Sequence, residues 1–143
     1  MQLTTHTDYS LRLLIYLAII GDDTTGTIQL AADSYGISAN HLAKVAQTLV
    51  QLGYIQSLRG RGGGLKLALP ANKINLGDVV RNTENLRLLE CFGEDSSCPI
   101  VPACNLKRVL AIAQNAFLET LDDYSLADLV SNRRQLNKLL EVS

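Results

Sequence analysis

Residues 27–52, TIQLAADSYGISANHLAKVAQTLVQL, decide the fold of this chain. Apolar side chains recur at intervals of three and four residues on both sides of Gly36, which predicts a helix over residues 28–35 and a second helix after Ser38. Glycine allows the positive φ angle that a sharp turn needs, and a serine at position 38 can cap the second helix. The stretch therefore predicts a helix-turn-helix, with Ile37 packed between its two helices.

The second helix has one apolar and one polar face. Its core-facing side chains are expected to be Leu42, Val45, Ala46, Leu49 and Leu52. The outward side chains are of types that reach base edges and phosphate groups, and with the capping serine they form a candidate DNA-contact set: Ser38, Asn40, His41, Lys44, Gln47 and Thr48. A polar helix face is more often simply hydrated, so the neighbouring sequence has to decide between these two interpretations.

Residues 53–69, GYIQSLRGRGGGLKLAL, follow this helix directly. Their side chains alternate over residues 54–58 and 65–69, which predicts a β-hairpin with a glycine-rich tip. Glycines let the backbone approach a phosphate strand closely, and Arg59 and Arg61 can enter a minor groove, where the electrostatic potential is most negative. A helix-turn-helix followed by such a hairpin predicts a mainly α-helical winged-helix protein that binds DNA.

All three cysteines lie within fourteen residues, from Cys91 through Cys98 to Cys104. Glycine, serine and proline interrupt this stretch, so we expect a loop that can bring three sulfur atoms round one centre. A structural zinc site usually has closer cysteine pairs and four ligands, and a disulfide would leave one cysteine over. Three thiolates with a missing fourth ligand fit an iron-sulfur cluster better, although the spacing differs from that of ferredoxins. The spacing alone leaves a cluster, a zinc site and a thiol switch open.

Further helices are expected around these two features. Thr5 or Thr7 can cap a helix from Asp8 to about residue 20, in which the Asp8 carboxylate would lie at the positive end of the helix dipole. A short helix is expected to begin at residue 74 or 75 and to lead towards the cysteines. Ser125 is expected to begin a last helix that continues to residue 140, with Asp128 completing a capping box.

A long helix after Cys104, capped by Asn105, is expected to carry an apolar stripe made of Leu106, Val109, Leu110, Ala113, Phe117 and Leu121. The small domain before it cannot cover this stripe, so we expect it to pair with the same helix of a second subunit, in a two-fold dimer that matches a palindromic operator. The chain is thus divided into a winged-helix domain (1–80), a connector with the cysteine loop (81–104), and a dimerisation helix with a C-terminal helix (105–143).

The composition fits one compact folded domain with an extension. The chain has 143 residues, of which 47% are hydrophobic. Its net charge of -1 does not by itself indicate a nucleic-acid partner, but residues 1–73 carry six basic and four acidic side chains, against seven and ten in residues 74–143. No apolar run is long enough to cross a bilayer, so we expect a cytoplasmic protein with no membrane partner. The DNA-binding motifs predict a regulator and not an enzyme.

The order of these motifs resembles that of a known family. The motifs are Tyr9-Ser-Leu-Arg12 followed by Tyr16-Leu-Ala18, a wing with the sequence RGRGGG at residues 59–64, the helix start Leu76-Gly-Asp-Val79, and three cysteines before a long helix. They are similar to those of the iron-sulfur winged-helix repressors typified by IscR and NsrR, over nearly the whole chain. The resemblance implies a homodimeric repressor that binds double-stranded operator DNA and carries an iron-sulfur cluster, of the 4Fe-4S type or, alternatively, the 2Fe-2S type.

The resemblance also implies the cluster ligands and the signal. Members of the IscR type have a histidine three residues after the third cysteine, where this chain has Lys107. Members of the NsrR type use an aspartate at the start of the first helix of the other subunit, where this chain has Asp8. The implied ligands are therefore Cys91, Cys98, Cys104 and Asp8 of the partner subunit, with His6 and His41 as lesser candidates.

The resemblance to the NsrR type also implies nitric oxide as the signal, and genes for nitric-oxide detoxification as the targets. The alternatives are a regulator of iron-sulfur cluster biogenesis, a DNA-binding repressor that depends on thiols or zinc, and, more remotely, an adaptor that does not bind DNA.

Overall fold

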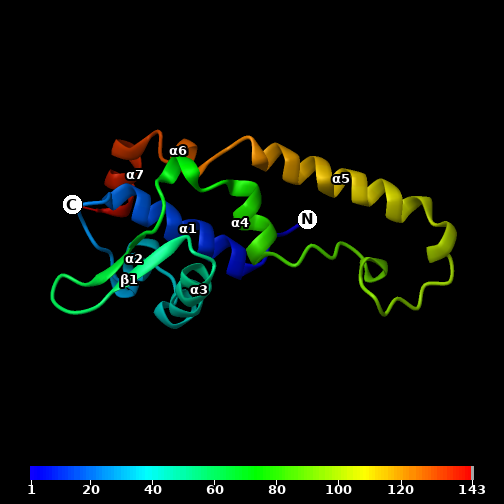
Figure 1. Cartoon of the computed structure of the whole chain (residues 1–143), viewed down its shortest axis with the longest axis horizontal. Coiled ribbons are helices and arrows are strands. Elements are labelled where there is room, and N and C mark those ends of the chain that lie inside the picture. Colours follow the sequence, from blue (N-terminus) through cyan, green and yellow to red (C-terminus); the bar gives the residue numbers. More distant parts are fainter. Residues whose placement is uncertain (143) are drawn as a thin grey trace.

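Figure 1 shows the computed structural model of the chain, which describes residues 1–142. Its helices and strands are α1 Thr5–Ile20, α2 Ile28–Tyr35, α3 Ala39–Gln51, β1 Ile55–Leu58, β2 Gly64–Leu67, α4 Leu76–Thr83, α5 Asn105–Asp122, α6 Leu126–Leu129 and α7 Arg133–Leu140. The helices α1 to α4 and the hairpin lie together at one side, and α5 extends away from them. The segment between α4 and α5 loops out at the far end of α5, and α6 and α7 return to α1. Within residues 1–142, none of the helices has the length and apolar character that crossing a membrane requires.

The cap of the first helix lies one position before Thr5 and three positions before Thr7, the two predicted caps. The Thr4 hydroxyl accepts a hydrogen bond from the Thr7 backbone N–H at 3.3 Å, so Thr4 is the cap, rather than Thr5 or Thr7. Thr7 cannot take that place because it is fully buried, where its hydroxyl accepts a hydrogen bond from Thr83 on α4 at 3.2 Å. A polar contact between α1 and α4 has therefore replaced the predicted cap.

The helix-turn-helix forms as predicted. Gly36 has φ 66°, and the Ser38 hydroxyl accepts a hydrogen bond from the His41 backbone N–H at 3.2 Å, which caps α3. Four of the five predicted core side chains of α3 are buried: Leu42, Val45, Ala46 and Leu49. Leu52 is 38% exposed, contrary to the prediction, because it lies beyond the last turn of α3 and the chain turns away at Gly53, which has φ 84°.

The predicted hairpin is antiparallel, with Ile55 opposite Leu67 and Leu58 opposite Gly64. Its strands are shorter than predicted, because residue 54 and residues 68–69 lie outside the ladder. Leu65 also exchanges two backbone hydrogen bonds with Gly26, at 2.7 and 2.8 Å. The turn before α2 therefore pairs with β2 through an isolated antiparallel bridge.

The long helix α5 is capped by Cys104 and not by Asn105. The Sγ atom of Cys104 accepts a hydrogen bond from the Lys107 backbone N–H at 3.4 Å, which ties the last cysteine to the first turn of α5. The predicted apolar stripe is divided between two faces. Leu110, Phe117 and Leu121 are partly buried, and Leu118, which the stripe did not include, is buried. An exposed row of large side chains remains, with Leu106 59%, Val109 51% and Ile112 57% exposed.

The C-terminal helix is two helices and not one. The predicted capping box of Ser125 and Asp128 is present at the start of α6. Leu126 is fully buried among the residues of α1, but at Val130 the backbone leaves the helical conformation (φ -114°, ψ 19°). The chain then turns and starts again as α7, which packs on α1.

Candidate functional site

The recognition face of α3 is built as the apolar pattern requires. Asn40, Lys44 and Gln47 are exposed, on the side of α3 away from its buried leucines. His41 differs from them, because its ring lies 4.8 Å from the ring of Tyr9 on α1 and is half-buried. Of the six predicted contact residues, three are therefore exposed polar side chains and one is held against the first helix. The remaining two make contacts within α3, because Ser38 caps the helix and the Thr48 hydroxyl donates to the Lys44 carbonyl at 3.3 Å.

The wing tip exposes both predicted arginines, Arg59 and Arg61. Gly60 and Gly62 have φ angles of 92° and 72°, so the backbone turns at these points in a conformation that side chains disfavour. The anchor of this tip is Thr25, which the sequence patterns did not indicate. Its hydroxyl lies 3.0 Å from the Gly62 carbonyl and 3.2 Å from the Gly63 carbonyl, and it donates to this pair. No local pattern indicates this contact, because it joins residues 37 and 38 positions apart.

Asp8 lies in a cluster that joins α1 to the helix-turn-helix. Arg12 donates a hydrogen bond from Nε to Oδ1 of Asp8 at 2.9 Å, and its Nη2 lies 2.9 Å from Oδ2. The Arg12 guanidinium also lies 5.6 Å from the ring centre of Tyr9 and 5.7 Å from that of Tyr35. An unbroken series of contacts therefore runs from Asp8 to His41 at the start of the recognition helix.

Tyr35 fixes this cluster to the turn between α2 and α3. Its phenol donates a hydrogen bond to the Arg12 backbone carbonyl at 2.9 Å. Burial raises the pKa of Tyr35 to about 12, although the Arg12 charge acts in the opposite direction and the Asp8 charge adds to the rise. The phenol therefore remains a protonated donor at neutral pH.

The three predicted cysteine ligands are unbridged and lie on one loop, but the chain alone does not bring them together. Cys91 is buried, Cys98 exposed and Cys104 half-buried. Among residues 1–142, no three histidine, cysteine, aspartate or glutamate side chains lie close enough together to hold a metal ion. Asp8 lies on α1, whereas the cysteine loop is at the far end of α5 (Figure 1). A single subunit therefore does not place its own Asp8 beside its cysteines.

Two contacts hold the cysteine loop in shape. The Glu90 carboxylate accepts hydrogen bonds from the backbone N–H and the hydroxyl of Ser97, both at 3.0 Å. These hydrogen bonds lower the pKa of Glu90, and they join the residue before Cys91 to the residue before Cys98. The donor set also suits an iron-sulfur cluster, since soft thiolate sulfurs are the ligands that such clusters use.

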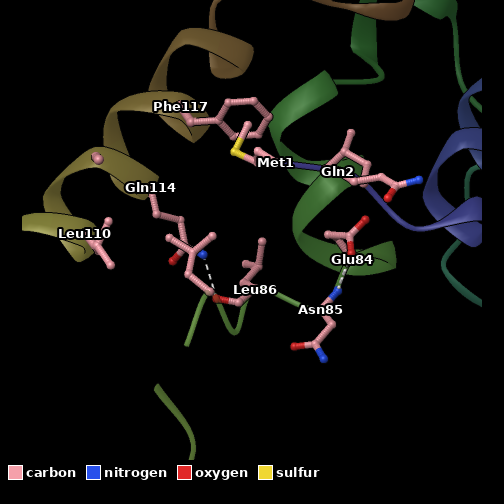
Figure 2. Close-up of a pocket in the computed structure, with 11 residues that line it drawn as sticks. Met1, Gln2, Glu84, Asn85, Leu86, Leu110, Gln114 and Phe117 are labelled. Carbon is pink, nitrogen blue, oxygen red and sulfur yellow. Dashed lines mark hydrogen bonds between the residues drawn. The ribbon is translucent and has the colours of Figure 1, made fainter. Parts of the chain in front are cut away.

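An apolar cavity of about 360 Å³ lies between the N-terminus, the segment after α4 and α5. Figure 2 shows Met1 and Phe117 on one side of it and Leu86 below, with Gln114 of α5 bonded across to the Leu86 carbonyl at 2.6 Å. The segment that leads to the cysteines is thus attached to the middle of α5 by this hydrogen bond.

The helix-turn-helix, the arginine wing and the exposed face of α3 define a winged-helix DNA-binding protein. The chain belongs to the Rrf2 family, whose members are described as iron-dependent transcriptional regulators and whose sequence pattern matches residues 3–132. The resemblance seen in the sequence motifs is therefore confirmed.

Relatives match the whole length of the chain. The HTH-type transcriptional regulator NsrR of Bacillus licheniformis is 47% identical over 142 residues, which are 98% of this chain and 99% of that protein. The protein of the same name from Bacillus subtilis is 47% identical over 144 residues, covering 99% of each chain. The structure of CymR, the global cysteine regulator of B. subtilis, is similar with a TM-score of 0.73 and 26% identity, over 92% of this chain and 98% of that one. The chain is thus a transcription regulator of the NsrR type and not an enzyme.

Proposed function

We propose that this protein is a nitric-oxide-responsive repressor that binds operator DNA as a homodimer and senses its signal through an iron-sulfur cluster. The observation that carries the proposal is the position of the cysteine loop. Three unbridged cysteines lie on the segment that leads into α5, and Cys104 itself caps this helix, in a chain that is 47% identical to NsrR regulators. The ligands in this proposal are Cys91, Cys98 and Cys104, with Asp8 of the partner subunit as the fourth.

In this proposal the fourth ligand comes from a second chain, because α1, which carries Asp8, lies away from the cysteine loop at the far end of α5 (Figure 1). The exposed row of Leu106, Val109 and Ile112 offers a surface for this second chain, since monomers rarely expose such a row to water. When bound, the cluster would supply an iron atom with one hard oxygen ligand among soft sulfurs, which suits it to exchange that ligand for a small molecule.

The side chains of Asp8 and Arg12 connect the proposed ligand position to the recognition helix α3. In the structure, Asp8 is paired with Arg12, so a carboxylate that becomes a ligand has to leave or share this ion pair. Arg12 also lies over Tyr9, which contacts His41 on the recognition helix. A change of partner at Asp8 therefore acts on groups that hold the start of α3, which supports a switch between DNA-binding and released states.

The DNA contacts in this proposal are made by α3 and by the wing. Asn40, Lys44 and Gln47, with Ser38 and His41 at the start of the helix, would read the major groove. Arg59 and Arg61 would contact the adjacent DNA backbone or minor groove from a tip that Thr25 keeps in place.

The cluster in the proposal is of the 4Fe-4S type, and the alternative is a 2Fe-2S cluster. The amounts of iron and sulfide bound per chain distinguish the two types.

The test uses the full chain purified without oxygen. We expect visible absorption from bound iron and sulfide, a dimer mass in sedimentation, and a mobility shift of promoter DNA that weakens with salt. Adding nitric oxide should bleach the absorption and release the DNA in parallel. A colourless protein that contains zinc and binds the same DNA would contradict the cluster, and a protein that shifts no DNA would contradict the repressor function.

A further inference from the structure

Gly77, in the first turn of α4, makes room for a residue at the end of α5. A Cβ atom at position 77 would overlap Oδ1 of Asp122 and would lie 2.9 Å from Nη1 of Arg81. The φ angle of Gly77 is not positive, so the turn itself does not require glycine. Glycine is a poor helix former, and its presence here is explained by the close approach of Asp122.

Both the side chain and the backbone carbonyl of Asp122 accept hydrogen bonds at this point. The Arg81 guanidinium binds both carboxylate oxygens, with Nη1 2.5 Å from Oδ1 and Nη2 2.8 Å from Oδ2. The Asn75 side chain donates to the Asp122 backbone carbonyl at 2.7 Å. A bidentate pair fixes orientation as well as distance, so the last turn of α5 has a defined angle to α4.

Backbone hydrogen bonds continue this attachment. The Leu76 N–H donates to the Tyr124 carbonyl at 3.0 Å, and the Leu126 N–H donates to the Ile74 carbonyl at 2.8 Å. The Leu126 side chain is fully buried in the core of the winged helix. We call the residues that make these contacts, namely 74–77, 81, 122, 124 and 126, the α4–α5 joint.

The rest of α5 is held less closely. Towards its middle, the cavity of about 360 Å³ separates it from the N-terminus, and Gln114 bridges to the Leu86 carbonyl across this space (Figure 2). Its exposed apolar row, Leu106, Val109 and Ile112, lies beyond the joint, towards the cysteine loop. The DNA-reading surface and the row that meets the partner are therefore on opposite sides of the α4–α5 joint.

We propose that Arg81, Asp122 and Gly77 are positioning residues that determine which spacing of operator half-sites the protein accepts. The inference rests on the proposed function, in which two copies pair through α5. The helix has 18 residues, a length of about 27 Å, so a change of about 10° at the joint moves its far end by about 5 Å. One base pair of added spacing moves a half-site by only about 3.4 Å. The angle at the joint therefore decides whether both recognition helices reach their half-sites at once.

The experiment measures the spacing preference itself. Wild-type protein first selects its half-site from a pool of random duplex DNA. Duplexes with two copies of that half-site are then made in a series that differs by one base pair in centre-to-centre distance. Affinities are measured for wild type, Asp122→Asn and Gly77→Ala, with Asp123→Asn as the matched control at the neighbouring carboxylate. Sedimentation and binding to a single half-site are recorded for each protein.

We expect wild type and Asp123→Asn to prefer one spacing by about tenfold over its neighbours, since each base pair also rotates the half-site by about 34°. Asp122→Asn and Gly77→Ala should reduce this ratio to about threefold or less, or move the optimum, while dimer mass and single half-site affinity stay unchanged. A loss of stability alone would not change a ratio of affinities. If Gly77→Ala does not fold, the spacing profile of Asp122→Asn tests the inference by itself. This substitution keeps the size of the side chain nearly constant and leaves Gly77 in place.

An unchanged spacing profile in Asp122→Asn would overturn this inference and would leave the proposed function standing. A wild-type protein with no spacing preference would overturn both the inference and the homodimeric function on which it rests.

Discussion

Arg12 binds both carboxylate oxygens of Asp8, with each nitrogen-oxygen distance at 2.9 Å. Both side chains are more than a third exposed, and pairs of this i, i+4 kind contribute only about 0.3–0.5 kcal/mol. The pair is therefore weak enough for the Asp8 carboxylate to exchange it for another partner, as the proposed role of a metal ligand requires.

Replacing Asp8 distinguishes two possible roles of this residue, a cluster ligand and a residue that only begins a helix. If Asp8 is a ligand, Asp8→Ala should still assemble a coloured protein but lose the colour faster in air, and it should bind operator more weakly. Asp8→Cys should restore a complete protein ligand set and slow the reaction with nitric oxide. Absorbance decay and stopped-flow mixing with nitric oxide measure these rates.

Arg12→Ala is the matched control, because it breaks the same ion pair and leaves the carboxylate in place. It should keep the wild-type colour lifetime. A heterodimer of Asp8→Ala and Cys98→Ser subunits keeps one site with three cysteines facing an intact Asp8, and that site should behave as in wild type. Wild-type decay and nitric-oxide kinetics in the Asp8→Ala homodimer would rule Asp8 out, and His6 would be tested next.

Each cysteine should be required for the bound cluster. Cys91→Ser, Cys98→Ser and Cys104→Ser should each give a colourless protein with weakened specific DNA binding. Asp95→Asn, an exposed neighbour on the same loop, serves as the control and should keep its colour. Iron and sulfide content per chain is the measurement, and full content in any one cysteine variant would remove that residue from the site.

Substitutions on the recognition helix and on the wing should change DNA binding in different ways. Arg59→Ala or Arg61→Ala should weaken binding to all sequences and lower the salt slope by about one per lost phosphate contact. Asn40→Ala should change base preference, at about 1–3 kcal/mol for a bidentate contact. Titrations at several salt concentrations, on operator and on variant sequences, distinguish the two effects. The control is Lys138→Ala on α7, on the opposite side of α1 from α3 in Figure 1. Unchanged affinity in all three variants would place the DNA interface elsewhere.

Sequence patterns predicted the parts of this fold that local periodicity encodes. Ser38, Gly36 and the leucines of α3 lie within a few positions of one another, so their spacing was sufficient. Contacts between distant residues were not predictable in this way. Thr25 anchors a wing tip 37 residues later, and Asp122 binds an arginine 41 residues earlier. The Cys104 sulfur as a helix cap was also missed, because cysteine is not among the residues that usually cap helices.

The candidate site shows the same division. Three cysteines before a long helix could be proposed as a ligand set from their positions in the sequence and from the family resemblance, and this stays a prediction. The pairing of Asp8 with Arg12, and the contact of Tyr9 with His41, became visible only once α1 and α3 were placed side by side. These contacts give a physical route from the ligand position to the recognition helix.

The pKa of Asp122 leads to a prediction about stability in acid. Hydrogen bonding to Arg81 lowers this pKa below its ordinary value of 3.8, so the folded protein binds the proton less readily than the unfolded chain does. The contribution of the pair is complete above the unfolded pKa and is lost as the pH falls through the lower folded pKa. Calorimetry should show a constant difference in melting temperature between wild type and Asp122→Asn from about pH 7 to about pH 5, shrinking below about pH 3.8. A difference that persists undiminished at about pH 2 would contradict the assignment.

The exposed row of α5 leads to a prediction about assembly. Ile112 is 57% exposed and Val109 51% exposed, on an arc of the helix that also contains Leu106. A glutamate at position 112 would have to be buried without a partner if this row is the dimer interface, which is strongly unfavourable. Ile112→Glu should therefore give a monomer in sedimentation at micromolar concentration. It should still fold, because position 112 lies outside the core of the single chain.

Asn115→Glu provides the matched control, since it adds the same charge one turn further along α5 on the polar arc. It should remain dimeric. The monomeric Ile112→Glu protein should also lose the benefit of a two-fold operator, so its affinity for a palindrome should fall towards its affinity for a single half-site. Because the fourth ligand is proposed to come from the partner, the same variant should lose its colour in air as fast as Asp8→Ala does. A dimeric Ile112→Glu protein with wild-type colour lifetime would mean that the two chains meet through another surface.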